Sequence, residues 1–119
     1  MTWTIQGDRP IWQQLREELT QRIVTGAYPM GSKLPSVRDL ASEAGVNPNT
    51  MQRALAELER DALVSTNRTS GRFVTEDEAL LASIRRELAK AHIRLYLHGM
   101  ETLGYTHEEA KEILMEETL

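Results

Sequence analysis

The apolar residues near the start of the chain recur at the spacing of a helix. Between residues 8 and 25 they stand mostly three or four positions apart, at Ile11, Trp12, Leu15, Leu19 and Ile23. This spacing puts them on one helical face, and Pro10 suits the first turn of such a helix. The glycines and proline of residues 26–31 then interrupt the pattern. We therefore predict an amphipathic helix of about four turns followed by a loop.

Two shorter apolar stripes follow between residues 34 and 61, joined by a glycine. Ser36 is a candidate N-cap with Asp39 three positions on, and Gly45 ends the first stripe. Asn47 is a candidate N-cap for the second stripe, with Pro48 in its first turn. The apolar positions are Val37, Leu40, Ala41 and Ala44 in the first helix and Met51, Ala54, Leu55 and Leu58 in the second. Two helices joined by a tight glycine turn predict a helix-turn-helix.

Strand-like residues replace the helical pattern after residue 61. Residues 63–66 and 72–75 are short β-favouring runs, and residues 67–71 between them have the composition of a hairpin loop. Three helices followed by a two-stranded hairpin predict a winged helix-turn-helix domain over residues 1–76. The expected fold class is therefore mainly α with a small β-hairpin.

The tail, residues 77–119, is predicted to be helical. Its apolar seam alternates steps of three and four through Leu81, Ile84, Leu88, Ala91, Leu95 and His98, as in helices that pack against a partner helix. Residues 103–105 interrupt the pattern, and Thr106 with Glu109 forms a capping box that begins a last helix. Two helices this short bury little between themselves, so their apolar faces need the winged domain or a second chain. We expect a homodimer held by Leu81, Ile84, Leu88, Ala91 and Leu95.

The length and composition exclude several classes of protein. At 119 residues the chain can form one compact domain with a short appendage, which is too small for a large catalytic fold. It has no cysteine, no apolar run of membrane-spanning length and no N-terminal secretory signal, so we expect a soluble cytoplasmic protein. His92, His98 and His107 lack the spacing of helical metal ligands. No nucleophile-base pattern occurs, and we predict no enzyme activity, cofactor or metal.

The net charge of −4 argues at first against a nucleic-acid partner, since DNA-binding domains usually carry a basic surface. The acidity is confined to the tail, because residues 1–76 hold nine Lys/Arg and nine Asp/Glu whereas residues 77–119 hold five and nine. The basic residues near the helix starts and the hairpin loop are Lys33, Arg38, Arg53, Arg68 and Arg72. A locally basic face on the winged domain is therefore compatible with the net charge.

The outward face of the second motif helix carries the residues that we expect to contact DNA bases. With about 100° of rotation per residue and Met51 at zero, Asn49, Arg53 and Arg60 lie on the side opposite the core, flanked by Gln52 and Thr50. The N-terminal part of a recognition helix faces the groove, which selects Asn49, Thr50, Gln52 and Arg53. Arginine can bind guanine, and asparagine or glutamine adenine, through paired hydrogen bonds. Asn47, which begins the helix, completes this set of candidates.

Other residues are expected to contact the phosphate backbone. The hydroxyl of Ser36 and the free NH groups beside it can meet a phosphate, and Arg38 lies in the same helical turn. Arg68 and Arg72 flank the hairpin tip, where a wing reaches the neighbouring groove or backbone. Plainer roles stay open: Ser36 and Asn47 serve as N-caps in either case, Arg38 could pair with a carboxylate, and Arg72 could solubilise a strand.

The motifs resemble those of a known family over residues 9–75. The matching runs are Pro10-Ile-Trp-Gln-Gln-Leu15, Ile23-Val-Thr-Gly-Ala-Tyr-Pro-Met-Gly-Ser-Lys-Leu-Pro-Ser-Val-Arg-Asp-Leu-Ala41, Val46-Asn-Pro-Asn-Thr50, Ala54-Leu-Ala-Glu-Leu-Glu59 and Phe73-Val74. Together they resemble the DNA-binding domain of GntR-type bacterial transcription regulators. The element at residues 46–50 and the short helical tail look like the YtrA branch of that family.

The resemblance implies a homodimeric regulator, most often a repressor, that binds a palindromic double-stranded DNA operator through two winged domains. By position it implies backbone contacts at Ser36 and Arg38 and a wing tip at Gly71. It implies recognition-helix contacts at Asn49, Thr50, Gln52 and Arg53. The tail is too small for the large effector domains of other branches, so the resemblance implies that it serves dimerisation, and an effector is left open.

Three residues depart from the family pattern. Ala62 stands where glycine usually follows the recognition helix, so either that helix ends without a left-handed residue or alanine tolerates mild strain. Thr69 replaces the first glycine of the usual wing motif, which leaves the wing's conformation open. Pro48 occupies a site where other branches carry a base-reading arginine, so specificity must rest on other residues.

The main alternative is a protein-interaction module that uses the winged fold and the acidic tail without specific DNA binding. A helix-glycine-helix of this length also occurs in proteins that never bind DNA. The hairpin and the seam-bearing tail favour the hypothesis of a dimeric transcription regulator.

Overall fold

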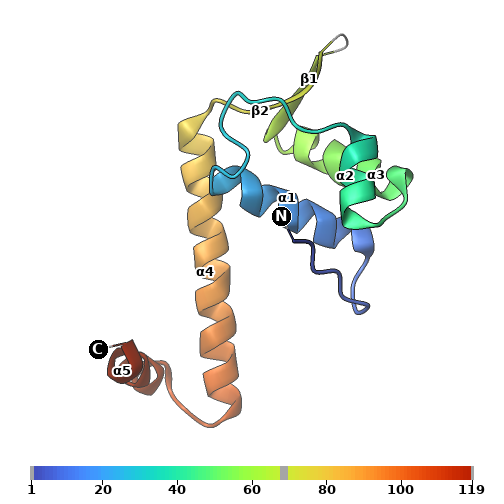
Figure 1. The fold of residues 1–119 in the computed structure, drawn as a ribbon. Coiled ribbons are helices and arrows are strands. Elements are labelled where there is room, and N and C mark those ends of the chain that lie inside the picture. Colours follow the sequence, from blue (N-terminus) through green and yellow to red (C-terminus); the bar gives the residue numbers. More distant parts are fainter. Residues whose placement is uncertain (1, 68–69, 119) are drawn as a thin grey trace. The chain divides into compact units, whose positions relative to one another are not determined.

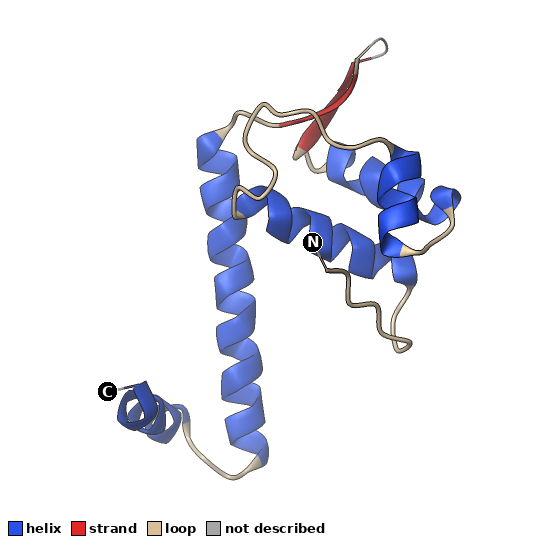
Figure 2. Ribbon diagram, viewed as in Figure 1, coloured by secondary structure: helices blue, strands red, loops and turns tan. Residues whose placement is uncertain are grey.

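The computed structural model describes residues 2–67 and 70–118, and Figure 1 shows the order of their elements. The helices are α1 (Ile11–Val24), α2 (Val37–Ala44), α3 (Pro48–Arg60), α4 (Glu78–Thr102) and α5 (His107–Thr118), and the strands are β1 (Val64–Asn67) and β2 (Gly71–Val74). These elements, coloured by type in Figure 2, confirm the predicted fold class. The chain divides into two compact units, one ending at Ala82 and the other beginning at Ser83, within α4.

The caps of α2 and α3 are those expected from the sequence. The Ser36 hydroxyl accepts a hydrogen bond from the Asp39 N–H at 3.1 Å, and the Asn47 side chain accepts one from the Asn49 N–H at 2.7 Å. Gly45 ends α2 in the left-handed conformation, with φ of 71°. Local hydrogen bonds therefore define the two helices and the turn between them.

The apolar faces of the first three helices form one core. α3 packs against α1, α2 and β1, and so lies at the centre of the winged unit. Its inward residues Met51, Ala54, Leu55 and Leu58 are buried, as are Leu15, Leu19 and Ile23 of α1 and Leu40 and Ala41 of α2. Each of these positions belongs to an apolar stripe that the sequence predicted. The opposite side of α3 is left available for other contacts.

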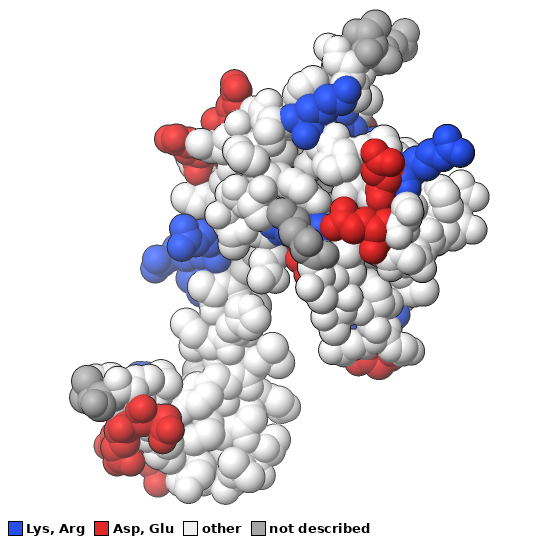
Figure 3. Space-filling view, in the orientation of Figure 1, with Lys and Arg blue, Asp and Glu red and all other residues white. Residues whose placement is uncertain are grey.

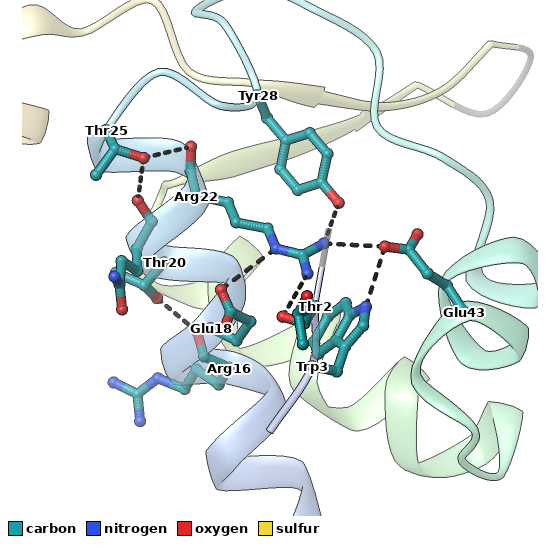
Figure 4. Close-up of polar contacts among 10 residues, drawn as sticks. Thr2, Trp3, Arg16, Glu18, Thr20, Arg22, Thr25, Tyr28 and Glu43 are labelled. Atoms are coloured by element: carbon teal, nitrogen blue, oxygen red, sulfur yellow. Dashed lines mark hydrogen bonds and ion pairs between the residues drawn. The ribbon is translucent and has the colours of Figure 1, made fainter. Parts of the chain in front are cut away.

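A buried arginine joins α1 to α2 and to the N-terminal segment (Figure 4). Arg22 is only 4% exposed, and its Nη1 donates to the Tyr28 hydroxyl at 2.9 Å and to Glu43 of α2 at 3.3 Å. Its Nε donates to Glu18 at 3.3 Å, and the Trp3 ring covers the guanidinium at 4.1 Å. The contacts of Arg22 thus connect four separate parts of the chain.

The charge on Arg22 is stabilised by its partners. Burial opposes the charged form, but the hydrogen bond to Tyr28 and the carboxylates of Glu18 and Glu43 outweigh it, so the pKa of Arg22 is raised. Trp3 also donates its indole N–H to the same Glu43 carboxylate, at 3.1 Å. The N-terminal segment is held a second time by the buried Gln14, whose side chain donates to the Gln6 carbonyl at 2.7 Å.

The two strands of the hairpin have the predicted length, and each is shifted by one residue toward the loop between them. β1 and β2 pair antiparallel, with Val64 opposite Val74 and Asn67 opposite Gly71. On the other edge of β2, the Leu34 N–H donates to the Arg72 carbonyl and the Val74 N–H to the Ser32 carbonyl, both at 2.9 Å. β2 is therefore hydrogen-bonded on both edges, and the segment before α2 is attached to the wing. Arg68 and Thr69 lie outside the described residues.

The tail unit is built from most of α4 together with α5. The predicted capping box is present: the Thr106 N–H donates to the Glu109 carboxylate at 3.0 Å, and the Glu109 N–H to the Thr106 hydroxyl at 3.1 Å. The backbone and side-chain hydrogen bonds from Thr106 lower the pKa of Glu109. The Tyr96 hydroxyl joins the two helices by donating to the Ala110 carbonyl at 2.5 Å.

The predicted apolar seam of α4 is unevenly covered within a single chain. Leu81 is 8% exposed and Ile84 half-buried, whereas Leu88 is 38% and Leu95 69% exposed, and Ala91 is exposed as well. The single chain thus buries the first part of the seam and leaves the later part open. Within the described ranges, none of the helices combines the length and the apolar character that a membrane span requires.

Ala62 resolves the question that the sequence left open at the end of α3. Among the described residues it is the one non-glycine with a left-handed backbone, at φ of 63°. The Leu63 N–H donates to the Leu58 carbonyl and the Ala62 N–H to the Glu59 carbonyl, both at 3.0 Å. This is a Schellman cap, which usually has glycine at the left-handed position. The alanine therefore tolerates strain so that the chain can turn into β1.

We predict that Ala62→Gly stabilises the protein by about 1 kcal/mol. An L-residue in the left-handed conformation costs about 1–2 kcal/mol, and relief of that strain is partly offset because glycine loses more backbone entropy than alanine on folding. Thermal unfolding followed by circular dichroism measures the change. Ala56→Gly, at an exposed interior position of α3, is the matched control and should destabilise by about 1 kcal/mol. Equal destabilisation by both variants would contradict the strain at Ala62.

Candidate nucleic-acid interface

A groove separates the start of α2 from the hairpin. Its volume is about 760 Å³, and the residues that line it include Lys33, Ser36, Arg38, Asp39, Gly71 and Arg72. Three of these side chains are cationic and one is anionic, so the groove is basic although the whole chain is acidic. Figure 3 shows basic side chains near the hairpin with acidic side chains close by on the same face. The groove is the local basic surface that the charge distribution allowed.

The start of α2 supplies groups that suit a phosphate. The first NH groups of a helix have no partner within the helix, and the helix dipole favours an anion there. Ser36 and Arg38 are both exposed at this end, and Arg38 forms no ion pair with any described residue. The Ser36 oxygen caps the helix, which leaves its hydroxyl hydrogen free to donate. Both predicted residues therefore line the groove in usable positions.

Lys33 is a groove residue that the site prediction omitted. It forms an isolated bridge with Phe73 of β2, and this pairing holds it beside the hairpin. Gly71 has φ of 100°, and a β-carbon there would stand 3.0 Å from Cε of Lys33. The positive φ is the reason that glycine suits this position, since the flexible end of the Lys33 side chain could move aside. The signal in the sequence was the location of Lys33, three residues before the Ser36 cap.

Arg72 lies on the inward side of the hairpin rather than at its tip. Side chains alternate along a strand, so Arg72 shares a face with the buried Val74. Its side chain is 19% exposed, and its Nε lies 3.7 Å from a carboxylate oxygen of Glu59 in α3. The Nε atom is buried without a hydrogen-bond partner among the described residues. Arg72 thus reaches from the groove toward α3, and it is not a freely solvated strand residue.

Contacts with neighbouring elements identify the two flanks of the outward face of α3. On the flank beside the hairpin, Glu59 approaches Arg72. On the flank beside α1, the guanidinium of Arg53 stacks over the Trp12 ring at 4.1 Å. With Met51 at zero and about 100° per residue, Gln52 and Glu59 lie near 100° and 80°, on the same side of α3. Gln52 therefore faces the groove side, and Arg53 the side of α1.

The remaining predicted residues lie at the start of α3. Asn47 and Asn49 are exposed, with the Asn47 side chain engaged as the N-cap, and Thr50 is half-buried. The structure thus gathers Ser36, Arg38, Gly71 and Arg72 around the groove and Asn49 and Gln52 on the exposed face of α3. Arg53 is held apart on Trp12, and Arg68 lies outside the described residues.

Acidic and histidine side chains do not assemble a metal site in the part of the chain that the structure describes, since no group of three or more potential ligands occurs there. His107 instead contacts the Glu101 carboxylate across the turn between α4 and α5.

A winged helix-turn-helix with a basic groove between its first motif helix and its wing has the architecture of a DNA-binding transcription regulator. The chain matches the family model described as "Bacterial regulatory proteins, gntR family" over residues 12–74. It belongs to the GntR family, and it is a regulator rather than an enzyme. The resemblance predicted from the sequence is confirmed.

Relatives and solved structures agree with this assignment. The chain is 36% identical to the HTH-type transcriptional regulator YhcF of Bacillus subtilis, an uncharacterized protein, over 90% of this chain and 88% of that protein. It is 34% identical to the HTH-type transcriptional repressor YtrA of the same organism, over 87% and 84%. A GntR family transcriptional regulator from Listeria monocytogenes superposes with a TM-score of 0.86 at 35% identity, covering 94% of this chain and 98% of that one. The similarity therefore extends through the helical tail.

Proposed function

We propose that this regulator is a repressor that binds a palindromic operator as a homodimer. The observation that carries the proposal is the groove lined by Lys33, Arg38 and Arg72, in the same winged unit as the exposed polar residues in the N-terminal half of α3. A winged domain needs a backbone-binding groove and a polar helix face to hold a duplex and contact its bases. The name of the similar YtrA protein supports repression. The site of action is the cytoplasm, where operator DNA lies.

The proposed contacts divide between the backbone and the bases. Ser36, Arg38, Lys33 and Arg72 bind phosphate. Gly71, which has no side chain, allows the backbone of the wing to come close to the DNA. Asn49, Thr50, Gln52 and Arg53 contact base edges from the start of α3, next to Asn47. Arg68 extends the wing contact. Gln52 and Asn49 provide the hydrogen bonds on the open face, and Arg53 acts from its stack on Trp12.

The dimer is proposed to form through the tail, residues 77–119, while residues 1–76 bind DNA. Leu88, Ala91 and Leu95 are exposed in the single chain although they continue the apolar seam. Exposed apolar side chains in register on one helix face gain free energy when a second copy covers them. Leu81 and Ile84 lie at the start of the seam, where the single chain already covers them partly.

Selection of bound fragments from random DNA should recover two half-sites whose centres are about 10 bp apart. Arg53→Ala should weaken operator binding by about 1–3 kcal/mol and relax the preference at one base pair of each half-site. Arg60→Ala is the matched control, because it removes the same charge two turns later from the same outward side. It should leave base preference unchanged. An unaltered selection profile for Arg53→Ala would remove that residue from the set of base contacts.

Arg38→Ala should weaken binding to operator and unrelated DNA alike, since a phosphate contact carries no sequence information. The slope of log affinity against log salt should become shallower by about one unit. Titrations of both DNA fragments at several salt concentrations measure the two effects. Loss confined to operator DNA, with the salt slope unchanged, would contradict a backbone role for Arg38.

Leu95→Glu should convert the protein from a dimer to a monomer at micromolar concentration, because it places a charge in the middle of an apolar contact. Sedimentation velocity measures the change. Ile93→Glu provides the control, since Ile93 is also exposed but lies off the seam. A monomeric unsubstituted chain, or equal dissociation by both variants, would show that this seam is not the dimer contact.

A further inference from the structure

We propose that Glu59 is a specificity-determining residue that withholds Arg72 from DNA until the duplex is fully seated against the wing. The inference rests on the proposed backbone role of the groove. It assigns a function to an exposed residue of α3 that is not among the proposed base contacts. The observations are the geometry of the Glu59–Arg72 pair and the place of Arg72 in the lining of the groove.

The pair is close enough for electrostatic attraction but is incompletely hydrogen-bonded. Nε of Arg72 and the nearest Glu59 oxygen are 3.7 Å apart, beyond hydrogen-bond distance. Nε is buried and has no hydrogen-bond partner among the described residues. A buried N–H group without a hydrogen bond costs free energy compared with one that donates to an acceptor at hydrogen-bond distance. The guanidinium is therefore attracted to Glu59 without being satisfied by it.

A phosphate in the groove would offer Arg72 a better partner. Arg72 is one of the residues that line the groove, together with Lys33 and Arg38. Charge-assisted contacts between guanidinium and phosphate are short and often paired. To make one, Arg72 must exchange its attraction to Glu59 for a phosphate that has come deep enough between the hairpin and α2. The exchange is favourable only when the duplex is seated.

Shallow contact with unrelated DNA gains nothing from Arg72. In that state Glu59 still neutralises the Arg72 side chain. Non-specific affinity depends on the number of phosphates that cations neutralise. By reducing that number by one in loosely bound complexes, Glu59 raises the ratio of specific to non-specific affinity. The protein thus distinguishes the operator from unrelated DNA by weakening the complex with unrelated DNA, not by adding a contact in the operator complex.

Glu59→Gln tests this mechanism with nearly unchanged side-chain size. It should raise affinity for a scrambled DNA fragment about three- to tenfold at low salt and steepen the corresponding salt slope by about one unit. Affinity for the selected operator fragment should change less than threefold. Glu57→Gln is the matched control, since Glu57 pairs with Arg60 at 3.9 Å and lies on the flank of α3 away from the hairpin. Thermal melts establish that each variant is folded.

The double variant Glu59→Gln/Arg72→Gln decides whether Glu59 acts through Arg72. The double variant should bind scrambled DNA no more tightly than the single variant Arg72→Gln does. A gain that persists there would overturn the proposal, because the carboxylate would then act on DNA directly. So would equal gains from Glu57→Gln, which would indicate net charge alone, or no gain from Glu59→Gln. If Arg38→Ala weakens binding while Glu59→Gln has no effect, only this inference fails; if neither variant has an effect, the groove itself is misassigned.

Discussion

The buried guanidinium of Arg22 is the interaction on which the placement of the helix-turn-helix depends. A charge taken out of water is costly unless nearby groups satisfy it, and leaving such a charge unpaired destabilises a protein by about 3–5 kcal/mol. Here the partners come from the turn at Tyr28, from Glu18 on the same helix and from Glu43 on α2. Because they meet at one group, α2 is held at a set position relative to α1. Both helices pack on α3, so the same contact also orients the DNA-facing helix.

The outward side of α3 is organised by its neighbours as much as by its own sequence. Trp12 holds Arg53 on one flank, and Arg72 approaches Glu59 on the other. Asn49 and Gln52 remain exposed between the two flanks. A helix that looks uniformly polar along this side is thus divided into a part engaged with α1, a part engaged with the hairpin and an open part. Pro48, which cannot contact a base by hydrogen bonds from its side chain, leaves the open part to amide side chains.

The tail differs from the winged unit in how little apolar surface it buries within one chain. Its two helices are linked by a reciprocal capping box and by the hydrogen bond from Tyr96 to Ala110, but they bury few apolar side chains. Short helices gain most of their stability from packing rather than from helix propensity. Exposed residues such as Leu88 and Leu95 are the ones that we propose a second copy of the chain covers.

Local sequence determined the helices, their caps and the buried stripes, because these depend on residues within a few positions of one another. Ser36, Gly45 and Asn47 act through hydrogen bonds and backbone conformations that neighbours along the chain define. The membership of the groove could be predicted only in part, since Ser36 and Arg38 were identified and Lys33 was not. Its basic character was likewise only permitted by the distribution of charge along the chain.

The tertiary structure alone decided which partner each long side chain takes. Arg53 stacks on a residue forty-one positions away, and Arg22 meets Glu43 across two helices. The inward direction of Arg72, which shares a face of β2 with the buried Val74, depends on how the hairpin packs against α3. Ala62 had two conformations open to it, and the requirement to bring β1 back onto α3 selected the left-handed one. These outcomes depend on how separate elements pack, and patterns among residues that are close in the sequence do not determine that packing.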